Sequence, residues 1–301
     1  MDSKKGFITI ATGKESYYKM AHNLLLSYRY HAATEAPFAI ICDRVNEWTA
    51  DFDKVVIIDD PSCSFFDKIR ILDLCPFEET IFVDADCLAY RDLNDLWELF
   101  INSPDVGVLG ETFPLDSGNG WWDQEILGDL KDLVDFKMDC QGGIYYVRKG
   151  KQLSAFKDTC NYVLNHFDKN DFRLYTDETI IALASSLHHF SPVQRWVEVF
   201  AYMPEAKFYA IDIHSGFLEY EWTRFPGPHY KNKYLIHFTT FHALNRWLYK
   251  REVFKLKRGP VDLSNFGDYL LLRFNHARHK LVMTFYRFFC NKRKYTMEIY
   301  A

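Results

Sequence analysis

Residues 80–90 read Thr80-Ile81-Phe82-Val83-Asp84-Ala85-Asp86-Cys87-Leu88-Ala89-Tyr90, and this stretch decides the fold. Ile81, Phe82 and Val83 are strand formers without polar alternation, the pattern of a strand buried on both faces of a parallel sheet. Two carboxylates, Asp84 and Asp86, follow at once. We therefore expect both acids at the carboxyl end of a central strand, the edge where open α/β sheets bind ligands.

One residue separates the two acids, so Asp84 and Asp86 can both turn toward one cation. A hard Mg²⁺ or Mn²⁺ ion held by one or two carboxylates takes its remaining ligands from water and substrate phosphates. The motif therefore predicts a metal site for a phosphate-bearing leaving group. The alternative is a pair of aspartates that only stabilise a turn.

Composition sets the limits on class and partners. The chain has 301 residues, 48% of them hydrophobic and 17% aromatic, which suffices for one large core with an appendage. A formal net charge of -5 argues against a nucleic-acid partner, although residues 265–301 are net positive and the remainder is acidic. Seven scattered cysteines without a C-x-x-C pair predict free thiols in a reducing compartment.

Targeting signals are weak in this sequence. The apolar stretch from Phe7 to Ala11 is shorter than the core of a signal peptide, and no segment approaches the ~20 apolar residues of a membrane-spanning helix. We therefore expect a cytoplasmic protein, with peripheral attachment to the cytosolic membrane face left open.

Strands and helices alternate in the first part of the chain, which predicts a parallel sheet with helices between its strands. Expected strands cover 7–11, 38–42, 55–58, 81–83, 106–109, 144–147, 193–200, 208–211 and 234–238, and expected helices 16–30, 65–74, 91–101, 152–167 and 176–186. No G-x-G-x-x-G follows the first strand, which disfavours a dehydrogenase.

A long irregular loop is expected over residues 111–140, and long loops within compact domains are usually functional. Trp121, Trp122 and Asp123 lie on it and could form a flat platform for a sugar acceptor. The alternative is that the tryptophans are buried for their apolar area.

Further candidates stand at the ends of later elements. Gln141 precedes Gly142 and Gly143, where missing Cβ atoms permit close approach by a ligand or by backbone. Asp177 begins a helix, as a cap or as a site residue. His237 ends an apolar run, and an imidazole beside two carboxylates would complete a metal site, although a single histidine is more often structural.

In this order the motifs resemble those of the family 8 glycosyltransferases over about residues 6–250. Asp84-Ala85-Asp86 is similar to the D-x-D metal motif, Gln141-Gly142-Gly143-Ile144 to the N-S-G-V stretch, Asp177-Glu178 to the D-Q pair, and His237-Phe238 to the start of H-F-x-G-x-x-K-P-W. Ala11, Thr12 and Tyr17 resemble the opening strand and its nucleotide-contacting tyrosine, and Lys68 the donor-binding lysine.

The resemblance implies an α/β GT-A fold, Rossmann-like, with a mixed, mainly parallel sheet and flanking helices. It implies a UDP-sugar donor, a Mn²⁺ or Mg²⁺ cofactor bound by Asp84, Asp86 and His237, and retention of anomeric configuration. Asp177 and Gln141 would lie beside the reacting sugar, while Ala11, Thr12, Tyr17, Lys68, Ala85, Gly142 and Gly143 would contact the donor. The predicted domain covers 1–255, with a nucleotide half over 1–110 and an acceptor half over 111–255.

Two departures from the family pattern bear on these roles. Gln141 replaces the usual Asn, which bears on donor-sugar identity. The segment after His237 is longer and lacks the glycine and lysine, so Arg246 is either a substitute diphosphate clamp or a surface charge.

The sequence favours a metal-dependent hexosyltransferase acting on a glycan, lipid-linked or protein acceptor. Two alternatives stay open. A haloacid-dehalogenase-like phosphatase also places D-x-D after an apolar strand. A non-catalytic protein that binds sugar nucleotides could share the same fold.

Residues 256–301 are expected to form a basic, amphipathic, helical C-terminal extension. Leu270, Leu271, Phe274, Leu281 and Phe285 recur at near-helical spacing, and basic residues surround them from residue 265 onward. The extension would either dock on an anionic membrane surface or pack its apolar face on the domain.

Overall fold

The computed structural model describes residues 4–194, 199–202, 206–222, 230–231, 233–239 and 247–258. Backbone contacts divide the chain into two compact units. The first comprises Met1–Ala201 with Lys233–His237, and the second comprises Tyr202–Asn232 with Phe238–Ala301. The domain boundaries expected at residues 110 and 255 remain predictions.

The first unit contains the elements that the alternating pattern predicted. Its strands are β1 (Lys5–Ala11), β2 (Phe38–Cys42), β3 (Lys54–Ile57), β4 (Glu79–Val83), β5 (Cys87–Ala89), β6 (Val106–Phe113), β7 (Lys137–Arg148) and β12 (Leu235–His237), with β8 (Phe200–Tyr202) at its limit. Its α-helices are α1 (Glu15–His31), α2 (Ile71–Leu74), α3 (Leu153–His166) and α4 (Asp177–Leu187). Short 3-10 helices are η1 (Glu47–Thr49), η2 (Phe65–Arg70), η3 (Leu93–Phe100), η4 (Gln124–Leu133) and η5 (Lys169–Asp171).

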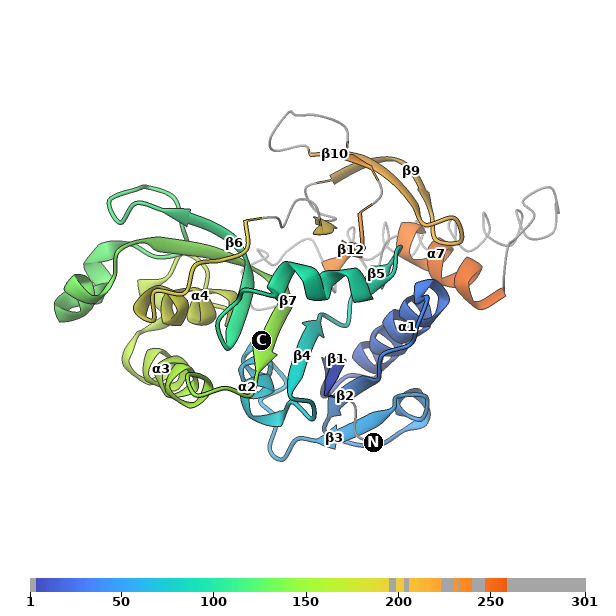
Figure 1. Cartoon of the computed structure of the whole chain (residues 1–301), viewed down its shortest axis with the longest axis horizontal. Helices are drawn as coiled ribbons and strands as arrows, with labels where there is room; N and C mark the ends of the chain where they lie inside the picture. The colour runs from blue at the N-terminus through green and yellow to red at the C-terminus, as the bar shows by residue number, and fades with distance from the viewer. Residues whose placement is uncertain are drawn as a thin grey trace, which may run out of the picture. The chain divides into compact units, whose positions relative to one another are not determined.

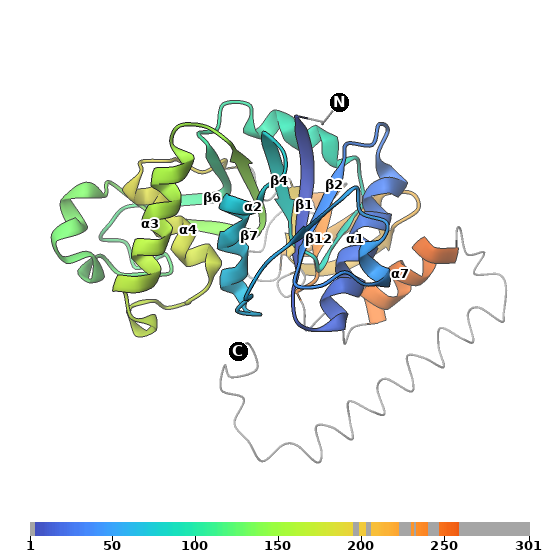
Figure 2. The ribbon, with the colours of Figure 1, turned by 90° about the horizontal axis from the view of Figure 1, so that it is seen from below.

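A six-stranded sheet forms the centre of this unit, in the order β3-β2-β1-β4-β7-β6 (Figures 1 and 2). β1, β2, β3 and β4 run parallel, whereas β7 is antiparallel to both β4 and β6. The sheet is therefore mixed and mainly parallel, as the sequence predicted. After β3 the chain returns to the other side of β1, so the strand order reverses between β1 and β4. Ligands of open α/β sheets bind at such a reversal, outside the carboxyl ends of the strands.

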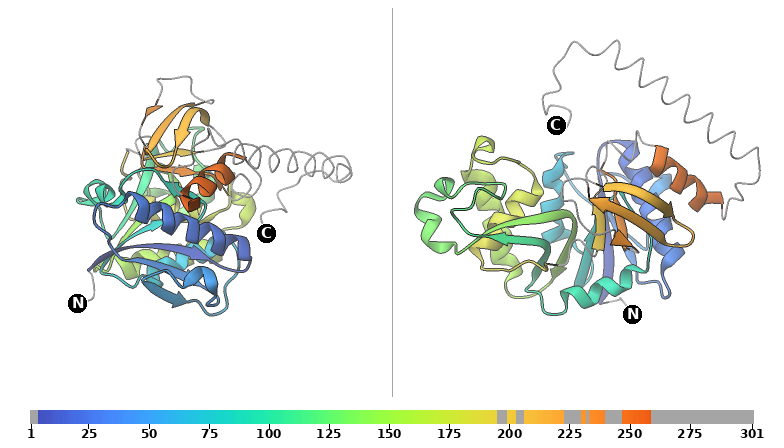
Figure 3. Two further views of the ribbon diagram at one scale, coloured as in Figure 1. Left: turned by 90° about the vertical axis from the view of Figure 1, so that its right-hand side faces the viewer. Right: turned by 90° about the horizontal axis from the view of Figure 1, so that it is seen from above.

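Burial explains why the central strands lack alternation. All five residues of β2 are buried, and Ile81, Phe82 and Val83 of β4 are fully inaccessible to solvent. Each large apolar side chain buried in this way contributes about 1.5–3 kcal/mol. α1 contacts β1 and β5, and α4 packs on β7 and α3. α3 and α4 (yellow-green) thus lie at one end of the unit and α1 (blue) at the other (Figure 3, right).

The expected loop over 111–140 is shorter than the sequence suggested. β6 continues to Phe113, where it pairs with Lys137 at the start of β7, and η4 occupies much of the remainder. Irregular backbone is left only at 114–123 and 134–136. Of the expected strand over 193–200, Val193 makes a bridge to Leu109, β8 begins at Phe200, and residues 195–198 lie outside the described part.

A second sheet has three strands in the order β5-β12-β8. β12 pairs antiparallel with β5, and the register places His237 opposite Cys87 and Leu235 opposite Ala89. Since β5 begins directly after the two acids, this pairing returns a segment that is distant in sequence to the carboxyl end of β4.

The second unit contains an antiparallel sheet, β11-β10-β9, formed by β9 (Ala206–Asp212), β10 (Phe217–Trp222) and β11 (Tyr230–Lys231), and the helix α7 (Trp247–Arg258). Within it, Lys255 Nζ lies 2.7 Å from Asp212 Oδ1. Arg246 and the expected tail at 265–301 lie outside the described residues. Across the described chain, no helix combines the length and apolar character needed to cross a membrane. The six described cysteines are free thiols.

Candidate functional site

The carboxyl end of β4 becomes a tight turn that carries the two acids. Asp84 donates its N–H to the Gly143 carbonyl at 2.9 Å, which continues the β4–β7 ladder by one residue. Cys87 N–H then donates to the Asp84 carbonyl at 3.0 Å and closes a turn over Asp84-Ala85-Asp86-Cys87. The acids therefore stand at the edge that the sequence predicted, beside the end of β1.

Lys68, from η2, points into the same edge. Its Nζ lies 2.7 Å from Asp84 Oδ2 and 3.7 Å from Asp177 Oδ2, and all three side chains are at least 87% buried. Burial alone would lower the pKa of Lys68, but the carboxylates of Asp177 and Asp84 raise it well above its usual range. The ammonium therefore stays charged and is the positive centre of this edge.

The pKa of the Asp84 carboxyl depends on burial and on the charges of Lys68 and Asp86. Burial raises the pKa of its carboxyl, and the attraction of Lys68 opposes that effect. The repulsion from Asp86 adds to the burial effect. Two carboxyls and one ammonium thus share a space with little water, where an added cation would relieve the remaining repulsion.

His237 reaches this edge from β12. Its Nε2 lies 3.1 Å from Asp86 Oδ1 and 3.6 Å from Asp84 Oδ2. Burial lowers the pKa of His237, but the carboxylates of Asp86 and Asp84 together outweigh that effect and raise it overall. The imidazole is thus brought together with both acids, as the sequence predicted for this histidine.

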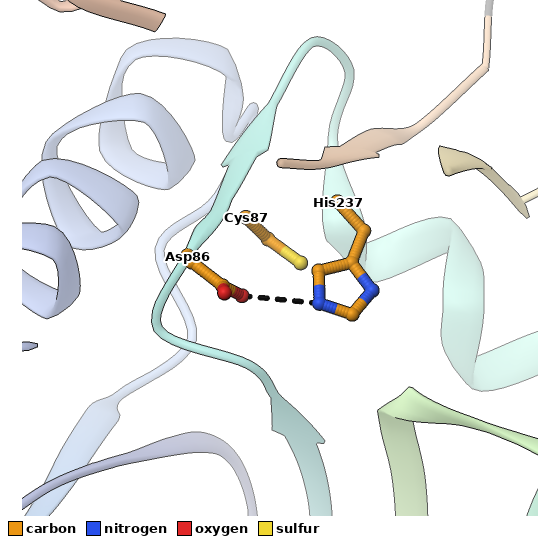
Figure 4. A group of neighbouring side chains, drawn as sticks. All are labelled: Asp86, Cys87 and His237. Atoms are coloured by element: carbon orange, nitrogen blue, oxygen red, sulfur yellow. Dashed lines mark ion pairs between the residues drawn. The ribbon is translucent and has the colours of Figure 1, made fainter. Parts of the chain in front are cut away.

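A possible metal-binding group includes one residue that the sequence analysis did not select. Ligand atoms of Asp86, Cys87 and His237 all lie within 4.8 Å of one another, and all three residues are buried (Figure 4). A carboxylate oxygen, a thiol sulfur and an imidazole nitrogen are all ligand types for divalent transition metals. The donor set fits a bound divalent cation, and the position of Cys87 directly after D-x-D was the available signal.

The glycine pair on β7 lines this edge through its backbone. A Cβ on Gly143 would lie 3.2 Å from His237 Nδ1, and a Cβ on Gly142 would lie 2.5 Å from Glu178 Cγ. A side chain at Gly142 would overlap Glu178, and a side chain at Gly143 would crowd the His237 ring. Gln141 is half-buried next to this pair on the same strand.

Asp177 and Glu178 begin α4 and bind two different parts of β7. Tyr145 donates its hydroxyl hydrogen to Asp177 Oδ2 at 2.7 Å, and its ring stacks on Phe82 of β4. Gly142 N–H donates to Glu178 Oε1 at 2.7 Å. Burial, followed by the charge of Asp177, raises the pKa of Glu178 to about 7. Neither Tyr145 nor Glu178 was among the predicted site residues, although Glu178 stands in the quoted D-Q-like pair.

The ends of β1 and β2 form the other side of the reversal. Ala11 is buried, and Thr12 donates to Asp67 Oδ2 at 3.0 Å. Tyr17 is half-buried near the start of α1, whereas its neighbour Tyr18 is fully buried and donates to Asp43.

Asp43 links these strand ends to each other. Its Oδ1 accepts the N–H of Gly13 at 2.9 Å, and Arg44 donates to its Oδ2 at 2.7 Å. Sequence reasoning missed Asp43, even though an acid directly after β2 carries the same strand-end signal as Asp84.

The predicted acceptor residues have different surroundings. Trp122 is fully buried and bridges to Phe172, so its ring has no face open to a sugar here. Trp121 is half-buried, and Asp123 forms an ion pair with Arg173. Lys137 is 1% exposed and donates to the carbonyl of Ser117, which ties the segment 114–123 to β7. Of the three residues, Trp121 and Asp123 remain acceptor candidates.

Comparison with known proteins gave structural neighbours only. No protein-family model and no curated protein sequence matches this chain. GlyE of Streptococcus pneumoniae TIGR4 is similar at 13% identity and a TM-score of 0.45, over 65% of this chain and 46% of GlyE. The bifunctional glycosyltransferase WbbM is similar at 15% identity and a TM-score of 0.47, over 68% of this chain and 41% of WbbM.

An active-site mutant of LgtC is similar at 13% identity and a TM-score of 0.49, over 84% of this chain and 95% of LgtC. The matched region thus spans less than half of the GlyE and WbbM chains. These structural neighbours are glycosyltransferases, the class of protein that the sequence motifs resemble.

Proposed function

We propose that this protein is a glycosyltransferase that moves a hexosyl group from a UDP-sugar to a carbohydrate, lipid-linked or protein acceptor, with a divalent cation as cofactor. The observation that carries the proposal is the gathering of Asp84, Asp86, His237 and Lys68 at the strand-order reversal between β1 and β4. Buried opposite charges at a sheet edge suit the binding of a diphosphate and its cation.

Asp84, Asp86 and His237 would hold Mn²⁺ or Mg²⁺, which supplies Lewis-acid stabilisation of negative charge on the leaving diphosphate. Lys68 would donate hydrogen bonds to the diphosphate oxygens, since its ammonium is already charged and positioned. Arg246 would add a second positive charge, although it lies outside the described residues. The chain thus supplies fixed positive charge where the breaking bond leaves negative charge.

The donor would lie along the edge between β1 and β7. Ala11, Thr12 and Tyr17 would contact the nucleoside, and the backbone of Ala85, Gly142 and Gly143 would approach the sugar diphosphate. Asp177 and Gln141 would orient the hexose, with Trp121 and Asp123 on the acceptor side. Retention of anomeric configuration is part of this proposal because the motifs resemble those of retaining enzymes.

We also propose that residues 265–301 contact an anionic membrane surface. The proposal rests on the alternation of apolar and basic residues in that segment, because the segment lies outside the described residues. Each basic residue close to such a surface contributes about 1 kcal/mol. Such contact would hold the enzyme beside a lipid-linked acceptor.

Donor hydrolysis tests the proposed activity. Purified protein with Mn²⁺ is supplied with UDP-glucose or UDP-galactose, and release of UDP is measured beside hydrolysis of p-nitrophenyl phosphate. We expect UDP release that Asp86→Asn abolishes and that Asp158→Asn, an exposed carboxylate on α3, leaves intact.

Two results would contradict the transferase. Phosphate release from p-nitrophenyl phosphate without UDP release favours the phosphatase. Inactivity on both substrates, together with stabilisation of the protein by UDP-sugars, favours a non-catalytic binder.

A further inference from the structure

We propose that the Cys87 thiol is a ligand of the cation at this site, and that the site therefore prefers Zn²⁺ or Co²⁺ to Mg²⁺ or Mn²⁺. This inference rests on the divalent cation of the proposed function and replaces two details of that proposal. Cys87 takes the place of Asp84 among the ligands, because Asp84 is paired to Lys68. Zn²⁺ or Co²⁺ takes the place of Mn²⁺ or Mg²⁺.

The turn after β4 places Asp86 and Cys87 together. The Cys87 N–H hydrogen bond to the Asp84 carbonyl fixes Asp86 as the third and Cys87 as the fourth residue of the turn. Strand β5 begins at Cys87, so from that point the side-chain direction follows the pleat. Neighbouring residues in a turn, unlike those in a strand, can present both side chains to one point.

The strand register supplies the third ligand. Cys87 and His237 are direct antiparallel partners, and such partners extend to the same face with Cβ atoms ~4.5–5.5 Å apart. Figure 4 shows the Cys87 sulfur directed toward the His237 ring, with the Asp86 carboxylate beside it. Cys87 is 1% exposed and His237 is 8% exposed, so the group is shielded from bulk water.

Asp84 is engaged elsewhere. Its Oδ2 is bound by Lys68 Nζ at 2.7 Å, a charge-assisted contact that already neutralises this carboxylate. Among the described residues, the group of ligand atoms that lie mutually within 4.8 Å includes Cys87 and not Asp84.

The donor set decides the class of metal. Zn²⁺ bonds sulfur at ~2.3 Å and nitrogen or oxygen at ~2.0–2.2 Å. The ligand atoms of a zinc site therefore lie closer to one another than 4.8 Å, the distance within which the three ligand atoms lie here. A small inward shift of the side chains would reach that geometry. Thiolate favours Zn²⁺, whereas Mg²⁺ and Mn²⁺ suit oxygen ligands. As the metal–sulfur bond forms, the S–H bond breaks and the proton passes to water.

Three protein ligands leave a coordination position open, as catalytic zinc sites do. A phosphate oxygen of the donor could take that position. The alternative for Cys87 is that of an ordinary buried cysteine, which behaves as a small apolar side chain.

Metal titration of the full chain distinguishes these roles. Protein stripped with a chelator is titrated with Co²⁺, and sulfur-to-cobalt charge transfer is followed by near-ultraviolet absorption. Zn²⁺ and Mn²⁺ affinities are measured by competition. Cys87→Ser is compared with Cys160→Ser, an equally buried thiol on α3. Circular dichroism confirms folding of each variant.

We expect a charge-transfer band in the parent and in Cys160→Ser that is lost in Cys87→Ser. Mutation of residues that only hydrogen-bond to metal ligands lowers metal affinity by ~10–100-fold. Loss of a direct ligand should therefore lower Zn²⁺ affinity by at least about tenfold. Mn²⁺ affinity should fall much less.

Binding of Co²⁺ without a sulfur band, or an unchanged Zn²⁺-to-Mn²⁺ preference in Cys87→Ser, overturns the inference. UDP-sugar hydrolysis supported by Mn²⁺ in that same variant would then show that the transferase stands while the sulfur ligand fails. If no divalent cation binds, both the sulfur ligand and the metal-dependent mechanism are refuted.

Discussion

Gly142 donates its backbone N–H to Glu178 Oε1 at 2.7 Å, and a Cβ on this glycine would lie 2.5 Å from Glu178 Cγ. The hydrogen bond and the close approach depend on each other, because a side chain on residue 142 would displace the carboxylate that its own amide binds. The first residues of α4 are thereby fixed against the middle of β7, where the next residue, Gly143, lies beside His237 of the candidate metal site.

Alanine at the two neighbouring glycines should have different effects. In Gly142→Ala the new methyl group overlaps Glu178, and we expect a loss of about 1–3 kcal/mol in the free energy of unfolding, as in other overpacked sites. Urea denaturation measures this loss. Gly118→Ala is the control, since nothing lies within 4 Å of a Cβ there. An unchanged stability would show that Glu178 moves aside freely.

Gly143→Ala should instead affect metal binding. Its Cβ would lie 3.2 Å from His237 Nδ1, so the imidazole must shift by a few tenths of an ångström. We expect weaker binding of a divalent cation with little change in unfolding midpoint, measured by calorimetric titration. Equal metal affinity in the parent and the variant would show that metal binding does not depend on the position of the His237 ring.

Stability should depend on pH through Glu178. Burial raises the pKa of its carboxyl from 4.5 to about 7 in the folded protein. The folded state thus holds this proton more tightly, and the stabilisation is complete below pH ~4.5 and is lost as pH rises through about 7. Glu178→Gln keeps an oxygen that can accept the Gly142 amide and removes the ionisation.

The measurement is the difference in unfolding free energy between parent and Glu178→Gln across pH 4.5 to 8, a range set by the pKa of about 7. Asp139, whose pKa burial raises to about 6, titrates in both proteins and cancels in the difference. We expect the advantage of the variant to grow with pH. A difference that does not vary with pH would place the carboxyl at its ordinary pKa.

Asp177→Asn should lower kcat by about 100-fold if this carboxylate orients the reacting sugar. UDP affinity should stay almost unchanged, because the nucleotide does not require that contact. Tyr145→Phe is the matched control, since it removes the hydrogen bond to Asp177 and keeps the ring stacked on Phe82. Equal losses of kcat and of stability in both variants would indicate a purely structural carboxylate.

Asp86→Asn should weaken the binding of a divalent cation, and with it the metal-dependent part of UDP affinity. The carboxylate lies 3.1 Å from His237 and is 6% exposed, so the variant loses charge at a buried position. Calorimetric titration of UDP with and without Mn²⁺ makes the comparison. If Asp86→Asn binds metal and UDP as tightly as the parent, the metal assignment is wrong.

Removal of residues 265–301 should abolish any attachment to lipid. We expect the full chain to sediment with anionic vesicles, more weakly at high salt because surface charges are screened. Vesicles of neutral lipid are the control. If the full-length protein remains in the supernatant, the membrane role is rejected and packing of residues 265–301 on the protein is favoured.

Local sequence pattern determined the main strands and their class. β2 and β4 were predictable because unbroken apolar runs indicate burial on both faces, and β1 because strand formers flank its single Thr9. The acid pair after β4 marked the candidate site. His237 was also predicted to join the acids, although only from its place at the end of an apolar run and from the family resemblance.

Tertiary structure alone decided which side chains meet. Cys87 and His237 are opposite each other through pairing between β5 and β12, and Lys68 binds Asp84 across sixteen residues. Nothing in the local pattern of either partner encodes such contacts, because strand register and side-chain direction are fixed only when distant segments pack. The burial of Trp122 has the same origin, because its bridge to Phe172 joins segments that are distant in sequence.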